Sequence, residues 1–173
     1  MSAELKYGLI TGTSVCLGLG LEYWLGFHTT RLAVSESSAC ISILILLFTL
    51  WLLLRHMQAD TTAGRLGLVP AVAAGLQSSL VAALVVCSFL LVYSQFINPE
   101  WIDTTLDWKV AQLRAAGVAE TVIRREIVLF RRANSPAGLV ATTVLGMTLM
   151  GAVFSFGLAL LLRGRASPPP GAG

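Results

Sequence analysis

The stretch that decides the fold runs from Leu68 to Ile97 and reads LVPAVAAGLQSSLVAALVVCSFLLVYSQFI. It contains no charged residue. The hydrocarbon core of a bilayer is about 30 Å thick, and a helix needs roughly 20 apolar residues to cross it. Counted from Pro70, this stretch would be about 42 Å long as a helix. It therefore predicts a transmembrane helix that either tilts or projects into water.

Three further apolar blocks lie at residues 7–27, 37–54 and 137–162. Hydrophobic residues make up 55% of the 173-residue chain and charged residues only 12%, whereas globular proteins carry about 25% charged residues. The first block is longer than the roughly 7 to 15 apolar residues of a signal peptide, so we expect it to be kept as a helix. These features predict an all-α integral membrane protein with four transmembrane helices in residues 1–162.

The segment from Asn98 to Ser135 has a different character, because it is rich in charged residues yet keeps apolar residues at helical intervals. Gly117 lies between the two stripes, where a helix would end in the left-handed conformation. The segment is therefore predicted to be an amphipathic helical hairpin outside the membrane. Its stripes are Trp101, Ile102, Leu106, Val110 and Leu113, then Val122, Ile123, Ile127 and Phe130.

Two short motifs predict where helices begin. In Asn98-Pro99-Glu100 the asparagine is expected to cap exposed backbone N–H groups and the proline to take the first helical position. Ser135 and Pro136 repeat this arrangement before the last apolar block. Residues 163–173, which read RGRASPPPGAG, are predicted to be a disordered tail.

The orientation in the membrane is estimated from Lys and Arg in the loops, which favour the cytoplasmic side. With four spans, one side carries Lys6, Arg55, Arg65, Arg163 and Arg165. The other side carries Arg31, Lys109, Arg114, Arg124, Arg125, Arg131 and Arg132. The raw tally mildly favours an external amino terminus, but most of the second group lies in a hairpin that also contains acids. Because the first and last spans are flanked by basic residues, we predict that both termini are cytoplasmic.

Small residues recur every four positions in the predicted spans, which lets helix backbones approach closely in lipid. Packing within the chain explains this pattern, and homodimerisation is the alternative. The stripes are Ala71, Gly75, Ser79, Ala83 and Cys87 in the third span, and Thr143, Gly151, Ser155 and Ala159 in the fourth, with Gly8 and Gly12 in the first.

Few polar residues fall within the apolar blocks. Glu22 is the only acidic one, and it is expected either to reach the membrane interface or to carry a proton or cation. Gln77 lies nearer the middle of the membrane and is expected to form an interhelical hydrogen bond. Trp101 belongs to an aromatic belt at the membrane surface, and Arg131 and Arg132 are candidates for contact with anionic lipid phosphate.

No constellation of residues points to catalysis. The two histidines, His28 and His56, are predicted to lie in loops on opposite faces, and no CxxC, HExxH or phosphate-binding loop is present. The three cysteines form no recognisable pair, and a net charge of +3 spread along the chain suggests no nucleic-acid partner. We therefore predict no catalytic residue, no bound metal and no cofactor, and we expect that the protein is not an enzyme.

Two functions fit this pattern. The first is a non-enzymatic accessory or interaction subunit, which binds another membrane protein or a second copy of itself in the bilayer. The alternative is a small oligomeric transporter or channel that uses Glu22 and Gln77 as its polar lining.

Several short motifs resemble the bacterial domain-of-unknown-function family numbered 4199. They are Lys6-Tyr7-Gly8-Leu9, Tyr93 through Trp101 with Ile97-Asn98-Pro99-Glu100, Gly117 followed by Glu120, Ser135-Pro136, and Gly151 with Ser155. The chain departs from the family at Arg65-Leu66-Gly67-Leu68, where an aromatic-glycine approach is expected. The resemblance implies a small four-span protein of the bacterial inner membrane, and it carries over no catalytic residue.

Overall fold

The computed structural model describes residues 1–29, 31–61 and 66–163, and every regular element within these ranges is helical. The elements are α1 (Ala3–Trp24), α2 (Leu32–Ala59), α3 (Leu68–Val92), the π-helical turn η1 (Tyr93–Ile97), α4 (Trp101–Ala115), α5 (Glu120–Ala133) and α6 (Pro136–Arg163). The all-α prediction is confirmed. The predicted tail lies outside the described residues, apart from Arg163.

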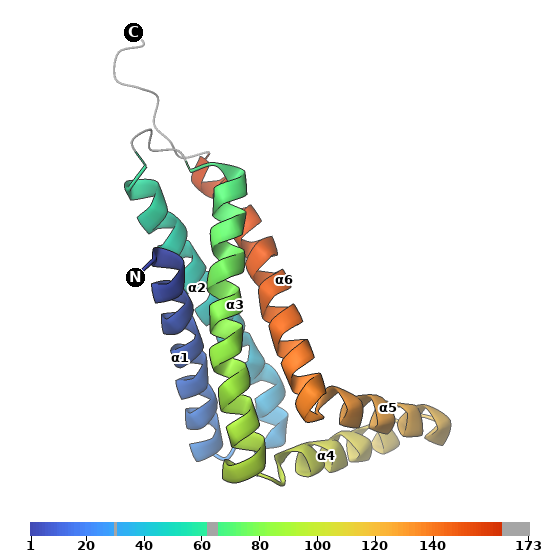
Figure 1. The fold of residues 1–173 in the computed structure, drawn as a ribbon. Coiled ribbons are helices and arrows are strands. Elements are labelled where there is room, and N and C mark those ends of the chain that lie inside the picture. The colour runs from blue at the N-terminus through green and yellow to red at the C-terminus, as the bar shows by residue number, and fades with distance from the viewer. Residues whose placement is uncertain (30, 62–65, 164–173) are drawn as a thin grey trace.

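Four helices form a bundle, and two shorter ones project from it. In Figure 1, α1, α2, α3 and α6 run side by side, with α3 between α1 and α6 and α2 behind them. Helices α4 and α5 project to one side from the lower end of the bundle. Helix α1 begins toward the opposite end of the bundle, where α6 ends.

Among the residues that the structure describes, three helices are long and apolar enough to cross a membrane, over Cys40–Ala59, Leu68–Ile97 and Pro136–Leu162. These spans support the predicted membrane location. Helix α1 has 22 residues and packs beside α3, yet it is not among the three. Its hydropathy is diluted by four glycines, several hydroxyl residues and Glu22. Apolar content therefore does not show that α1 is a transmembrane span, as the prediction of four spans requires.

The predicted boundaries of the second span are wrong. Helix α2 begins at Leu32 and continues to Ala59, so His56 lies within a helix and not in a loop. The charged residue Arg55 does not end the helix, because arginine is a good helix former, and its guanidinium lies over the Trp51 ring, 5.4 Å from the ring centroid. A long side chain can thus stay helical while its charged end reaches toward water.

The small-residue stripes are used for packing within the chain. An added Cβ at Gly8 would lie 2.6 Å from the Ser78 carbonyl oxygen, so α1 can approach α3 this closely only with glycine there. The crossing of α3 and α6 is reciprocal: Gly75 faces Ser155 and Gly151 faces Ser79. The two serine hydroxyls are buried and form no hydrogen bond within the described part of the chain.

The two predicted helix-start motifs have different outcomes. The Ser135 hydroxyl accepts a hydrogen bond from the Gly138 N–H at 3.1 Å, and Pro136 is the first residue of α6. Asn98 does not cap α4, because α4 begins only at Trp101 and Pro99 stays outside it. The π-helical turn that ends α3 carries Asn98 inward, where its side chain has a different partner.

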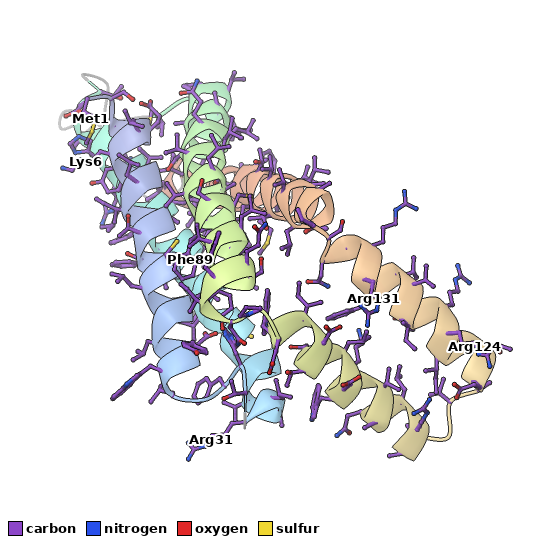
Figure 2. The ribbon with its side chains drawn as sticks, turned by 60° about the horizontal axis from the view of Figure 1, so that its bottom comes forward. Met1, Lys6, Arg31, Phe89, Arg124 and Arg131 are labelled. Atoms are coloured by element: carbon purple, nitrogen blue, oxygen red, sulfur yellow. The ribbon has the colours of Figure 1, made fainter. Side chains whose placement is uncertain are left out.

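Helices α4 and α5 form an arm that is held together along one face. Gly117 joins them with a φ of 70°, the left-handed conformation predicted for it. Leu106 and Ile123 are buried between the helices, but Val122, predicted to belong to the same stripe, is 48% exposed. Figure 2 shows the arm extending from the bundle with Arg124 and Arg131 on α5.

Candidate functional site: a buried polar cluster beside an apolar cavity

Four polar side chains meet at the arm end of the bundle and are almost completely buried. We call Glu22, His28, Tyr93 and Asn98 the polar cluster. His28 Nε2 lies 3.3 Å from Glu22 Oε2, and His28 Nδ1 lies 2.7 Å from the Tyr93 hydroxyl oxygen. The Asn98 amide donates to the same hydroxyl at 3.2 Å. Each residue is at most 9% exposed, so these contacts replace the water that the four groups would otherwise bind.

The donors and acceptors of the polar cluster fit one arrangement. Because Tyr93 accepts a hydrogen bond from Asn98, its own O–H is free to donate to His28 Nδ1. His28 then carries its proton on Nε2, which points at the Glu22 carboxylate. This assignment leaves no clash between two donors or two acceptors.

Burial also sets the charge of the imidazole. Desolvation lowers the pKa of His28 below its ordinary value, while the charge of Glu22 and its hydrogen bond oppose that shift. Because burial is the largest effect, the ring is neutral near pH 7. A neutral ring is also what the acceptor role of Nδ1 requires.

Local backbone geometry brings the cluster together. After α1, Gly26 adopts a φ of 79°, which turns the chain so that His28 folds back beside Glu22. On α3, the π-helical turn begins at Tyr93, and the Asn98 N–H bonds to the Tyr93 carbonyl at 2.8 Å. Such turns are rare and are often found at functional sites.

Aromatic rings enclose the polar cluster. The Tyr93 ring packs against Tyr23, Phe89, His28 and Trp101, with centroids 5.5 to 5.9 Å apart. The Trp101 ring also lies 5.8 Å from the His28 ring. Trp101, which the sequence assigned to an aromatic belt, is therefore packed against the buried cluster at the start of the arm.

An apolar cavity of about 390 Å³ borders the polar cluster. His28, Tyr93 and Trp101 contact one another and line one part of the cavity. The rest of the wall comes from all four bundle helices, and its apolar part includes Val15, Leu19, Leu46, Val86, Leu90 and Met150. The volume falls in the range of about 300 to 1,000 Å³ that is typical of small-molecule sites.

The structure separates the other candidate residues. Gln77 is exposed on α3, whereas Glu22 is buried at the far end of the same bundle, so the two do not line a common path.

The two arginines before α6 have different surroundings. Arg131 is paired with Asp103 at 3.0 Å, which ties α5 to α4. Arg132 is exposed and has no ion pair within the described residues.

Sequence reasoning found Glu22 but missed its partners. The sequence offered two roles for the Glu22 carboxylate, either reaching the membrane interface or carrying a proton or cation, and in the structure the residue is 7% exposed and faces His28. His28 and Tyr93 were overlooked because they are 65 positions apart. The signal that could have revealed the contact between Glu22 and His28 was their spacing of six residues across a glycine-containing turn.

Within the ranges that the structure describes, no group of three His, Cys, Asp or Glu residues could hold a metal ion. Comparison with known proteins adds one result. The sequence profile described as "Protein of unknown function (DUF4199)" matches residues 6–164. No curated protein and no solved structure matches the chain. Because this match covers nearly the whole sequence, the chain belongs to the DUF4199 family of proteins of unknown function.

Proposed function

We propose that this protein is a non-enzymatic subunit of a membrane assembly and that it associates with a second copy of itself through α3. The contact surface, which we call the Gln77 face, consists of Ala73, Gln77, Leu80 and Leu84. All four are exposed, and their spacing places them on one side of the helix. The opposite side of α3 is buried against α1 and α6.

The exposed amide of Gln77 is the observation that carries this proposal. Gln77 lies about 14 Å along the helix from Leu68, inside the longest apolar span. Its side chain has no hydrogen-bond partner among the residues that the structure describes. An unpaired amide in hydrocarbon costs free energy, and amides of this kind associate transmembrane helices by hydrogen bonding across the interface.

A second copy is the partner that best satisfies this group. An amide both donates and accepts, so two Gln77 side chains can pair with each other across a two-fold axis. The glycine and serine stripes do not compete for this role, because Gly75, Ser79, Gly151 and Ser155 are already packed inside the bundle.

The arm adds a membrane-surface element to the proposed subunit. On α5, Val128 is 66% and Leu129 is 48% exposed, and the exposed Arg125 and Arg132 lie on the same side. A helix with apolar and basic residues on one side binds at the interface of an anionic bilayer. The proposal also includes α1 as the fourth span, cytoplasmic termini and an inner-membrane location.

Association in liposomes tests the Gln77 face. The full chain is labelled with donor or acceptor dyes, and energy transfer is measured as the lipid-to-protein ratio rises. We expect Gln77→Leu to weaken association by about 0.6 to 2 kcal/mol, the range of interhelical polar contacts, and Gln77→Asn to retain most of it.

Gln95→Leu is the matched control. Gln95 is also exposed, but it lies in the π-helical turn at the end of the span, so the same substitution should change association little. Energy transfer that is equal for the parent and Gln77→Leu, or absent in both, would contradict the proposal.

A further inference from the structure

We infer that the apolar cavity binds the hydrocarbon chain of a membrane amphiphile whose head group is small, uncharged and capable of hydrogen bonding. The chain would lie among the four bundle helices and the head would lie beside Tyr93 and Trp101. The inference does not depend on association through Gln77.

The cavity lies on the arm side of the apolar core that α2 and α6 share, and Leu46 and Met150 belong to both. Nearer the end of the bundle away from the arm, these helices share an apolar core that includes Leu50, Leu53 and Phe154. The cavity wall also takes residues closer to the arm, which are Ser42 and Ile43 from α2 and Thr142, Thr143, Gly146 and Met147 from α6. Most of these side chains are short or lie at the rim, so they leave space unfilled.

Gly146 accounts for part of that space. It lines the cavity, and an added Cβ there would meet no atom within 4 Å. Glycine in a helix interior costs about 1 kcal/mol relative to alanine, and no close helix contact requires it at this position. A bound chain would fill the volume that the missing side chain leaves.

The cavity opens toward the surface that lipid must cover. Ile43 on α2 is 38% exposed, and Thr142 on α6, which lines the same cavity, is also exposed. The neighbouring outward residues are large and apolar, with Leu44 61% and Leu145 62% exposed. A ligand entering by this rim would come from the hydrocarbon region of the bilayer.

The polar end of the cavity selects the head group. Both ring nitrogens of His28 are engaged within the polar cluster, and the ring is neutral. The Trp101 indole N–H has no partner among the described residues and is a donor. The Thr143 hydroxyl, which also lines the cavity, can accept. Among the described residues the wall has no cationic side chain, so a phosphate or carboxylate head would be buried there without a counter-charge.

Photolabelling of the full chain in phosphatidylcholine liposomes tests the inference. The probe is hexadecanol with a diazirine near the chain end, and labelled peptides are identified by mass spectrometry. Gly146→Leu, which fills the cavity, and Ile43→Trp, which blocks its rim, should each lower labelling of α2 and α6 about tenfold, equivalent to about 1.4 kcal/mol of binding.

Gly157→Leu is the matched control, because Gly157 lies on the same helix, is equally open around an added Cβ and does not line the cavity. Its labelling should equal that of the parent. Elution as a single species in detergent is the check that each variant has folded. The two blocking substitutions lie on different helices, so a loss of labelling in both does not come from damage to one helix.

Two further probes test the head group. Diazirine-bearing palmitate at high pH and diazirine-bearing phosphatidylcholine should label the cavity peptides at least tenfold less than the alcohol. Equal labelling by either one overturns the assignment of a small uncharged head. Labelling by the alcohol that neither blocking variant reduces overturns the site itself.

Discussion

The Nδ1 atom of His28 lies 2.7 Å from the hydroxyl oxygen of Tyr93, and this contact joins the turn after α1 to the last turns of α3. Both side chains are at most 4% exposed. One buried hydrogen bond thus connects two segments that are far apart in the sequence. Glu22 contacts the other nitrogen of His28, and Asn98 donates to the Tyr93 hydroxyl. The stability of this end of the bundle should depend on these groups.

Tyr93→Phe removes the hydroxyl that His28 and Asn98 share. We expect it to lower the free energy of unfolding by about 1 to 3 kcal/mol, because two buried polar groups lose their partner. The measurement is denaturant-induced unfolding in detergent micelles. Tyr23→Phe is the control, since Tyr23 contacts the Tyr93 ring but is 36% exposed, and its hydroxyl forms no hydrogen bond among the described residues. Equal losses in both variants would show that the hydroxyl of Tyr93 is unimportant.

The protein should lose stability as the pH falls below about 6.5, the ordinary pKa of histidine. Burial lowers the pKa of His28 in the folded state, so the unfolded chain binds its proton first. Because the unfolded state then holds more protons, the free energy of unfolding falls with decreasing pH until the folded protein is protonated too.

The Tm measured in detergent between pH 5 and 8 checks this expectation. His28→Gln should reduce the dependence on pH, and His56→Gln, at a histidine whose side chain is 48% exposed, is the control. A parent protein whose Tm is constant from pH 7 to 5 would disagree with a neutral buried His28.

Gly75→Ala should destabilise the bundle by about 1 to 3 kcal/mol, because the new Cβ would overlap the Ser155 side chain. Adding Ser155→Gly should restore much of this loss, since it removes the overlapping atoms. Gly157→Ala, where space is open, should be neutral or slightly stabilising. Unfolding in detergent reports all three, and a double variant no better than the single one would place the strain elsewhere.

Reporter fusions test α1 as a fourth span. A reporter fused after Arg163 is expected to be active in the cytoplasm, and one fused after Arg31 is expected to be active in the periplasm. Figure 2 places Lys6 and Arg31 near opposite ends of α1. Cytoplasmic activity after Arg31 together with periplasmic activity after Arg163 would contradict a topology in which α1 crosses the membrane and both termini are cytoplasmic, because the three spans α2, α3 and α6 lie between the two fusion points.

Much of the fold was predictable because it depends on local properties. The span from Leu68 to Ile97 is recognised by its uninterrupted apolar length, and Gly117 by its place between two helical stripes. Ser135 and Pro136 act within one turn of the helix that they begin. The end of α2 was mispredicted because Arg55 suggested a boundary, whereas its stacking on Trp51 is compatible with a continuous helix.

The candidate site was only partly predictable. The sequence by itself determined that Glu22 and Gln77 are the polar residues to examine, because charge and amide groups are scarce in its apolar blocks. Only the tertiary structure decided that Glu22 is buried against His28 while Gln77 faces outward. The physical reason is that hydropathy and helix capping are determined by residues that are neighbours in the sequence. Burial of a side chain depends instead on how each helix is rotated about its own axis. That rotation is set by close contacts such as Gly75 with Ser155, which involve distant parts of the chain.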